Sequence, residues 1–261
     1  MDEPVFQSAA GRFLPTVHAR GPWDLDALHG GAPAALLARA VERFEPAPDL
    51  AVVRLSYEFL RPVPVAPLDL EVAMVRPGRR VQLVGASLLA EGREVCRLTA
   101  LRVGRVPADP ELAAGPPGPG LARPGTLPTT PFVLGGGAGP SFAATAIEMR
   151  FARGVGARGP VAVWLRLRRA ILDDEEPTPL MRVAAAADFG NGVSAELDFA
   201  RTTFVNPDLV VHLRRSPNGP WVLLDARTAI EPGAGAMAVS DLHDEDGPLG
   251  VAVQALLVRR R

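Results

Sequence analysis

The chain has 261 residues, and 48% of them are hydrophobic, which is enough for one large core or two smaller ones. Its formal net charge is −1, and its 28 basic residues are scattered along the sequence. This distribution lacks the basic stripe of a nucleic-acid-binding protein and the polybasic cluster of a membrane-surface protein. We therefore expect no nucleic-acid partner and no membrane partner.

The sequence has no sign of export. Its N-terminus, Met1-Asp2-Glu3-Pro4, is acidic and lacks the basic and then apolar order of a secretory signal, and no apolar run approaches the length that spans a bilayer. These features predict a soluble cytoplasmic protein. The single cysteine, Cys96, cannot form an internal disulfide, and we interpret it as a packing or surface residue rather than a nucleophile.

The first long element expected in the chain is a buried helix over residues 29–44. Small and aliphatic side chains surround this segment on almost all sides, which is typical of a helix enclosed by other elements. Pro33 suits the first turn, where its missing N–H has no partner to lose, and Pro46 and Pro48 end the helix soon after Phe44.

After this helix the hydrophobic period changes to two, which predicts half-buried strands. In the first of them Val53, Leu55 and Tyr57 face one side, and the residues between them are polar. Turns at Pro77-Gly78 and Glu91-Gly92 separate later segments of the same kind. We therefore expect an antiparallel meander with strands over 51–59, 68–76, 81–90 and 94–103.

Residues 107–140 are rich in proline and glycine and have little periodicity, so we interpret them as a linker. A glycine-rich stretch such as 135–139 can in other proteins cradle a phosphate. This one lacks the Lys-Ser/Thr pair and the strand-loop-helix setting of such loops, and we do not assign it that role.

The sequence after the linker repeats the order of the first half. Asp246-Gly247 lies 155 residues after Glu91-Gly92, and this offset superimposes the final segments of the two halves. Two copies of one supersecondary unit are the simplest explanation. The expected elements are extended segments over 147–151 and 161–167, a helix over 177–189, and strands over 209–214, 221–230, 236–242 and 249–258.

Both predicted helices are apolar, and an apolar helix has to be enclosed. A curved antiparallel sheet wrapped around each helix is the simplest enclosure, and pairing the sheets edge to edge would cover the edges that each half leaves open. We therefore expect an α+β fold of two fused domains over residues 1–106 and 141–261, joined by the linker 107–140.

Distinctive motifs occur in both halves of the chain. The first half contains Gly21-Pro-Trp-Asp, Leu28-His-Gly-Gly-Ala-Pro and Phe59-Leu-Arg-Pro-Val-Pro. The second half contains Ala187-Asp-Phe-Gly-Asn, Asn206-Pro-Asp-Leu-Val-Val-His-Leu and Val253-Gln-Ala-Leu-Leu-Val-Arg. Together they resemble the acyl-CoA thioesterase II-like double-hotdog family of the thioesterase superfamily, over residues 13–259 apart from the linker.

The resemblance implies a double-hotdog fold, in which each domain is a curved antiparallel sheet around a central helix. It also implies that a positioned water hydrolyses a fatty or related acyl-CoA. Because the sequence shows no metal-ligand cluster and no phosphate loop, we expect no metal or other cofactor. Two fused hotdogs still leave a sheet face or edge exposed, and the family commonly associates further. We therefore expect a homodimer of double hotdogs.

The resemblance further implies the residues that position this water. In the family they are an Asp on the central helix of the second hotdog, a Gln on its last strand and a Thr near its first long strand. Asp188 and Gln254 fall on the first two motif positions. The third falls on Phe204, so Thr203 or Thr202 is expected to supply the hydroxyl. If neither does, the alternative is a catalytically weak acyl-thioester-binding hotdog protein.

The residues themselves are compatible with this chemistry, and each also has a simpler explanation. Asp188 ends an apolar helix, where helix carbonyls disfavour a carboxylate, unless the helix end is exposed. Gln254 interrupts the apolar run Leu249–Val258, and its amide can both donate to and accept from a water, but it could also lie on the wet face of an edge strand. Because the two residues are 66 positions apart, contact between them would favour the functional interpretation.

His29, Gly30 and Gly31 precede the first helix, whose free N–H groups could polarise a thioester oxygen or hold a phosphate of CoA. Glycine permits the close approach that such donors need. The alternative is a plain turn into a buried helix, with His29 as a cap or surface residue. We assign these three residues to substrate binding.

Other reaction classes have less support. The four histidines are far apart in sequence, and the acidic run 241–246 looks like a solvated hairpin turn, so no metal site is predicted. A Gly-x-Ser-x-Gly motif is absent, which disfavours a Ser/His/Asp hydrolase. A hydratase or dehydratase on this fold uses an Asp/His pair, and no histidine lies close to Asp188 in sequence.

Overall fold

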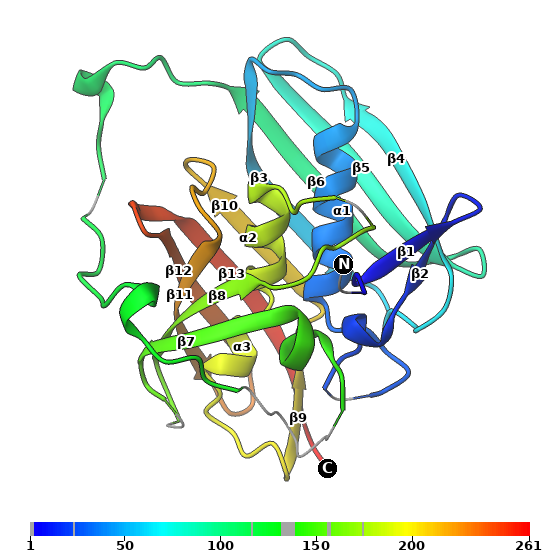
Figure 1. The fold of residues 1–261 in the computed structure, drawn as a ribbon, viewed down its shortest axis with the longest axis vertical. Helices are drawn as coiled ribbons and strands as arrows, with labels where there is room; N and C mark the ends of the chain where they lie inside the picture. Colours follow the sequence, from blue (N-terminus) through cyan, green and yellow to red (C-terminus); the bar gives the residue numbers. More distant parts are fainter. Residues whose placement is uncertain (1–2, 23, 116, 132–138, 156–157, 174) are drawn as a thin grey trace.

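The computed structural model describes residues 3–22, 24–115, 117–131, 139–155, 158–173 and 175–261. Its strands form one long antiparallel sheet that curves around two central helices, α1 (Gly31–Arg43) and α2 (Pro179–Ala187), which lie side by side (Figure 1). The α+β fold of two sheet-wrapped helices expected from the sequence is confirmed.

The N-terminal half contains the buried helix and the meander that the sequence predicts. Besides α1, its elements are β1 (Phe6–Ala9), β2 (Arg12–Pro15), β3 (Leu50–Phe59), β4 (Leu68–Arg76), β5 (Val81–Ala90) and β6 (Arg93–Gly104). In β3, Leu55 and Tyr57 are buried, as the alternation indicates. The pattern does not predict β1, because only Phe6 of its four residues is buried and the strand has no alternating period.

The C-terminal half repeats this order. Besides α2, it contains β7 (Ile147–Arg153), β8 (Val161–Leu167), α3 (Gly190–Val193), β9 (Thr202–Val205), β10 (Asp208–Leu213), β11 (Trp221–Ile230), β12 (Ala236–Asp244) and β13 (Gly247–Arg260). The helix expected over 177–189 is shorter at both ends. Thr178 caps its start by accepting from the N–H of Met181, and Asp188 is the residue at which the helix ends.

The two halves join where β3 pairs with β10. Leu55 lies opposite Val211, and Tyr57 lies opposite Leu209. This pairing produces the strand order β1-β2-β4-β5-β6-β3-β10-β13-β12-β11-β8-β7, with β9 added beside β13. The edge-to-edge pairing expected from the sequence is confirmed, and it brings the two central helices together.

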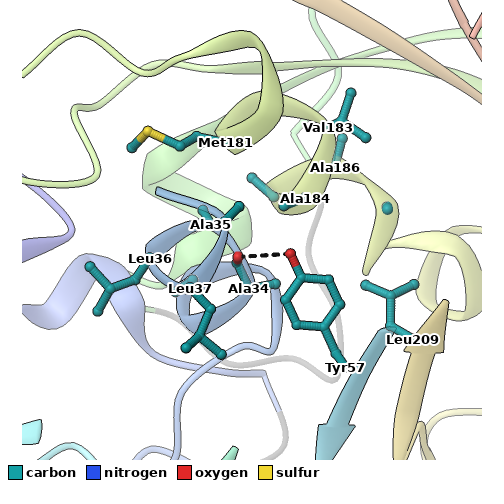
Figure 2. Packing of buried hydrophobic residues seen from close by; sticks show 14 of the residues in the cluster. Ala34, Ala35, Leu36, Leu37, Tyr57, Met181, Val183, Ala184, Ala186 and Leu209 are labelled. Atoms are coloured by element: carbon teal, nitrogen blue, oxygen red, sulfur yellow. Dashed lines mark hydrogen bonds between the residues drawn. The ribbon is translucent and has the colours of Figure 1, made fainter. Parts of the chain in front are cut away.

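Small side chains allow α1 and α2 to pack closely. Figure 2 shows Ala34 and Ala35 of α1 on the side of Ala184 of α2, and all three are fully buried. Tyr57 of β3 donates its hydroxyl to the carbonyl of Ala34 at 3.1 Å, which satisfies a polar group inside the core. Neither α1 nor any other helix in the described ranges is long and apolar enough to cross a bilayer.

The second part of the predicted linker packs on the C-terminal half. Trp164 of β8 donates to the carbonyl of Ala122 at 2.9 Å, and Arg150 of β7 donates to that of Pro124 at 2.8 Å. Leu121 and Leu127 cover a small apolar cluster on the outside of the sheet. These contacts could not be expected from composition alone. Residues 132–138, which include most of the glycine-rich stretch, lie outside the described residues.

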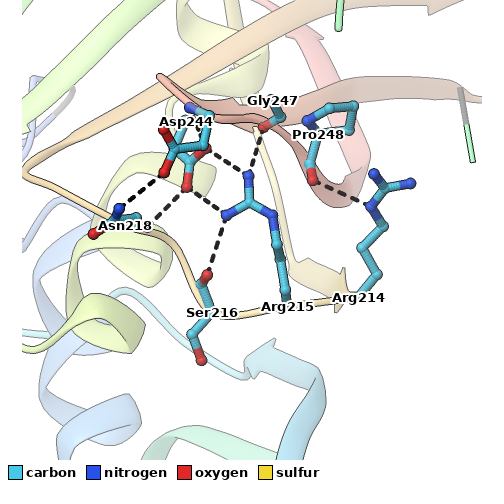
Figure 3. A network of polar contacts seen from close by, with 8 residues as sticks. Arg214, Arg215, Ser216, Asn218, Asp244, Gly247 and Pro248 are labelled. Carbon is cyan, nitrogen blue, oxygen red and sulfur yellow. Dashed lines mark hydrogen bonds and ion pairs between the residues drawn. The ribbon is translucent and has the colours of Figure 1, made fainter. Parts of the chain in front are cut away.

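An ion pair between the buried Asp244 and the half-buried Arg215 fixes the turn between β12 and β13 (Figure 3). Both carboxylate oxygens of Asp244 accept from the Arg215 guanidinium at 2.6 Å, and one also accepts from the Asn218 N–H at 2.8 Å. Burial alone would raise the pKa of Asp244, but the bonds from Arg215 and from backbone N–H groups bring it below its usual value. The interpretation of 241–246 as a solvated turn is therefore wrong for Asp244, which is 3% exposed.

Arg102 closes the C-terminal end of α1. Its guanidinium donates to the carbonyls of Val41, Phe44 and Glu45, which have no partner in the helix itself, and the residue is 4% exposed. A charged donor at this end also complements the negative pole of the helix.

We predict that Arg102→Met lowers the free energy of unfolding by about 2–4 kcal/mol, because buried carbonyls lose a charged donor. Urea denaturation followed by circular dichroism measures this change. Arg97→Met on the same strand is the matched control, since Arg97 forms an exposed pair with Glu58 that contributes at most about 1 kcal/mol. Equal losses in the two variants would contradict the capping role of Arg102.

Candidate active site

A cavity of about 360 Å³ lies between the two halves of the molecule. It is bounded by the segment before α1, the loop that follows β3, the end of α2, and the turn between β9 and β10. Apolar side chains predominate in its wall, and the few polar ones are Asp24, His29, Arg61, Asp188, Asn191 and Asn206. The cavity exists only where both halves meet.

Asp188 is the buried acid of this cavity. It ends α2 and is 5% exposed. Its Oδ1 accepts from the side-chain amide of Asn206 at 2.9 Å, and its Oδ2 lies 3.1 Å from Nδ1 of His29. The interpretation of Asp188 as an exposed helix end is therefore wrong, because the second half of the sheet and the start of α1 enclose it.

Gln254 lies behind Asp188 and orients it. Its Nε2 donates to the main-chain oxygen of Asp188 at 3.2 Å and approaches Oδ1 at 3.5 Å, and its Oε1 accepts from the N–H of Asn191 at 3.0 Å. Gln254 is 1% exposed, so the wet-face interpretation is wrong. A side chain at Gly190 would place its Cβ 2.8 Å from Oε1, which explains the glycine there. Asp188 and Gln254 are thus in contact despite their separation in sequence.

His29 lies in the same group of residues with its ring buried. Its Nδ1 faces Asp188 and also lies 3.0 Å from the N–H of Gly31, which points at it. The ring stacks on Phe189 at 4.4 Å between centroids and lies 5.3 Å from Phe142. Sequence separation disfavours an Asp/His pair in this protein, but the fold forms one.

The two glycines before α1 have different surroundings. Gly30 lines the cavity, and a Cβ there would lie 2.8 and 2.9 Å from the carboxylate oxygens of Asp188. Gly31 does not line the cavity. A Cβ on Gly31 would lie 2.7 Å from the carbonyl oxygen of Ala185, so glycine is needed there for the close approach of α1 and α2.

Thr202 and Thr203 do not reach this group. Both lie on β9 beside the C-terminal end of β13, and the Thr203 hydroxyl accepts from Nε of Arg261 at 3.1 Å. Neither lines the cavity, and no described residue of its wall carries a hydroxyl. The expectation that one of them supplies a hydroxyl to the site is thus not supported, because the turn after β9 brings Asn206 to Asp188 instead.

Asn206 is the site residue that the sequence analysis does not identify. A signal exists, because Asn206-Pro207 directly precedes the strand whose motif resembles the family, and a half-buried amide at the start of a strand needs partners. The family pattern indicates a hydroxyl near the start of β10, whereas in this chain the amide of Asn206 donates to Asp188 there.

The groups behind Asp188 are uncharged. Burial raises the pKa of Tyr57 well above its usual value, and the neighbouring Cys96 and Asp188 raise it further. Burial likewise raises the pKa of the Cys96 thiol, with Asp188 as the next cause. In the described part of the chain, no group of three or more His, Cys, Asp or Glu residues is arranged to hold a metal ion.

Comparison with known proteins identifies the family. Residues 19–103 match the acyl-CoA thioesterase N-terminal domain, and residues 119–258 match the acyl-CoA thioesterase C-terminal domain. The chain therefore belongs to the acyl-CoA thioesterase family. The second match begins inside the predicted linker, in agreement with the packing of residues 121–130 on the C-terminal half. A search of curated proteins gives no match.

Solved structures share the double-hotdog fold along almost the whole chain. A conserved hot dog fold protein of unknown function from Alicyclobacillus acidocaldarius has a TM-score of 0.73 at 18% identity, covering 98% of this chain and 95% of that one. The acyl-CoA thioesterase II TesB2 of Mycobacterium marinum has a TM-score of 0.68 at 16% identity, covering 97% and 94%. At identities of 18% and 16%, the similarity to these structures shows that the fold is shared and nothing more.

We predict that the Cys96 thiol of the native protein does not react with Ellman's reagent at pH 8, because burial and the raised pKa leave almost no thiolate. One thiol per chain should appear after denaturation in guanidinium chloride. Rapid reaction of the folded protein would contradict the assignment of Cys96 as a packing residue.

Proposed function

We propose that this protein is a thioesterase that hydrolyses a fatty or related acyl-CoA to the free acid and CoA, with a water positioned at Asp188. The observation that carries the proposal is the buried carboxylate of Asp188, which lines a mostly apolar cavity and is oriented by the amides of Asn206 and Gln254. Membership in the acyl-CoA thioesterase family supports the substrate class.

The number of acceptor positions on Asp188 supports a role in holding water. A carboxylate offers about four of them. Asn206 and Gln254 approach Oδ1, and His29 faces Oδ2. Among the described residues no further side-chain donor contacts Oδ2, so a water in the cavity can form a hydrogen bond there at roughly 2.6–3.2 Å.

The backbone N–H of Gly30 is the proposed donor to the thioester oxygen. Gly30 lines the cavity at the start of α1, and its N–H has no acceptor among the described residues. Negative charge develops on the carbonyl oxygen when water attacks, and a fixed N–H at the positive end of a helix stabilises it. Donors of this kind contribute about 3 kcal/mol to catalysis.

The apolar wall of the cavity is the proposed site of the acyl chain. Leu28, Phe59 and Val63 come from the first half, and Phe189 and Val205 come from the second. Each buried methylene contributes about 0.8 kcal/mol to binding, so a chain fits this wall better than a polar substrate does. The cytoplasmic location and the homodimer of double hotdogs stay predictions.

A catalytically weak acyl-thioester-binding protein is the second candidate. The observation that favours it is the missing hydroxyl in the described wall of the cavity, because the family site includes a threonine. Such a protein would bind acyl-CoA in an equilibrium titration but would release almost no thiol. Hydrolysis of at least one acyl-CoA, many times per protein molecule, would exclude it.

We predict that Asp188→Asn lowers kcat by about 100-fold or more with little change in KM, because the amide keeps the shape of the carboxylate but loses its negative charge. Release of free thiol from a series of short to long acyl-CoAs, without added metal, measures this. Asp24→Asn is the matched control, since Asp24 is an exposed carboxylate on the same cavity.

Three outcomes would count against the proposed function. They are equal turnover by wild type and Asp188→Asn, loss of activity on adding a chelator, and absence of thiol release over the whole series. The series should include a 2-enoyl-CoA. Loss of its double bond without thiol release would indicate a hydratase that uses the His29 and Asp188 pair.

We also predict that Gly30→Ala lowers kcat/KM by about 100-fold without unfolding the protein. The new Cβ would lie under 3 Å from both oxygens of Asp188, so the carboxylate has to move, and an error of about 1 Å at a reacting group costs this much. Gly30 has a φ of −58°, so alanine adds no backbone strain. Gly125→Ala, where a Cβ meets nothing within 4 Å, is the control. Unchanged activity of Gly30→Ala would mean that the position of Asp188 is not critical.

A further inference from the structure

We infer that His29 is a catalytic residue: its Nε2 accepts the proton of the attacking water, and Asp188 holds its Nδ1–H. This inference rests on the proposed thioesterase function and changes the role of His29 from substrate binding to proton transfer. It starts from the contact between Nδ1 of His29 and Oδ2 of Asp188, which are 3.1 Å apart and both buried.

A proton has to lie in that contact. An ionised carboxylate only accepts hydrogen bonds, and a bare Nδ1 also only accepts, so two such atoms at 3.1 Å would repel each other. With the proton on Nδ1, the imidazole donates to Asp188 in the way that buried Asp and His residues pair in hydrolases. A neutral ring in this tautomer has its free lone pair on Nε2.

The N–H of Gly31 indicates a second possible protonation state, in which Nδ1 of His29 carries no proton. It points at Nδ1 from 3.0 Å, and it can donate there only when Nδ1 carries no proton. In that state the shared proton sits on Asp188, and Nε2–H faces away as a donor. The two bonds at Nδ1 therefore belong to different protonation states, and a measurement of the tautomer distinguishes them.

We place the Nε2 edge of the ring on the side of the cavity. His29 lines the cavity, and its Nε2 has no hydrogen-bond partner among the described residues. It is also not among their buried polar atoms that lack a partner, so it keeps some exposed surface, and the cavity is the open space that His29 lines. Stacking on Phe189 and contact with Phe142 fix the ring plane, so Nε2 keeps this direction.

The reaction then proceeds in two balanced steps. The water oxygen forms a bond to the thioester carbon while one of its protons moves to Nε2, and the carbonyl electron pair moves to the oxygen near Gly30 N–H. Collapse of this intermediate breaks the carbon–sulfur bond, and the proton on Nε2 passes to the sulfur of CoA. The imidazole returns to its starting state, and no further reactant is required.

The titratable groups around the ring define the expected pH dependence. Asp188 faces Nδ1, and Asp24 and Arg61 are the other charged side chains of the cavity wall. Tyr57 and Cys96 are neutral because burial raises the pKa of both. The base form needs an unprotonated Nε2, so kcat/KM should increase as the pH rises.

His29→Asn tests the inference, because the asparagine amide can replace Nδ1–H toward Asp188 but offers no Nε2. We expect kcat to fall by about 100-fold or more, with KM changed less than about threefold, and the loss of activity at low pH to disappear from the profile. His212→Asn, on an exposed position of β10, is the matched control and should retain activity. Thermal melting of both variants checks folding.

Nitrogen NMR of the four histidines supplies a readout that does not depend on turnover. The signals missing from His29→Asn identify His29, and we expect a protonated Nδ1 and a bare Nε2 in the neutral ring. An Nε2–H tautomer would overturn the inference, as would a kcat for His29→Asn within threefold of wild type, or a rise in KM alone. If the wild type releases no thiol from any acyl-CoA, the proposed function is overturned. The tautomer measured by NMR then still shows whether Nδ1 of His29 donates to Asp188.

Discussion

The rest of the site depends on the burial of one carboxylate, that of Asp188. Helix carbonyls disfavour a negative charge at the end of α2, and moving a carboxylate into a protein interior costs several kcal/mol. Donors from three other elements offset this cost, namely the amides of Asn206 and Gln254 and the imidazole of His29. Because His29 precedes α1 and the two amides belong to the second half, the carboxylate is satisfied only after both halves have folded and paired. Assembly of the site and assembly of the double sheet are therefore coupled.

The two halves share a fold, but the equivalent positions in the first half cannot form a second copy of this site. β3 and β10 pair symmetrically about Ser56 and Val210, which are 154 residues apart, and the β5–β6 and β12–β13 hairpins match at the same spacing. The offset of 155 expected from the turns in the sequence is therefore one residue too long. With the offset of 154 residues, Gln254 corresponds to Ala100, a fully buried residue without a polar group. The end of α1 is closed by Arg102, which donates to the helix carbonyls that a buried acid would have to face. The first half thus contributes the start of α1 with His29 and Gly30 to the site, and the second half contributes the acid, Asp188.

Much of the fold could be predicted, because alternating strands and an apolar helix are local patterns. The features that sequence could not give are those that depend on partners far along the chain. β9 is four residues long and exists because β13 extends beside it. The docking of Leu121 and Leu127 on the outer sheet depends on a surface formed by β8 and β11. In the same way, the sequence indicated Asp188 and Gln254, but only the pairing of the two halves brings His29 to the acid.

The resemblance implies a threonine hydroxyl as the third group of the site, but the structure has the amide of Asn206 beside Asp188. This difference has a consequence for the mechanism. A hydroxyl can pass a proton on, because its oxygen both donates and accepts. The amide of Asn206 can orient Asp188 as well as a hydroxyl does, but its N–H keeps its proton at neutral pH, so it cannot carry one to or from a water. Hydrolysis nevertheless has to move one proton from the water to the leaving sulfur. Of the described residues whose side chains contact the carboxylate of Asp188, His29 is the one whose side chain can take up a proton and release it again. In the proposed mechanism the imidazole therefore carries this proton, so the reaction needs no hydroxyl in the wall of the cavity.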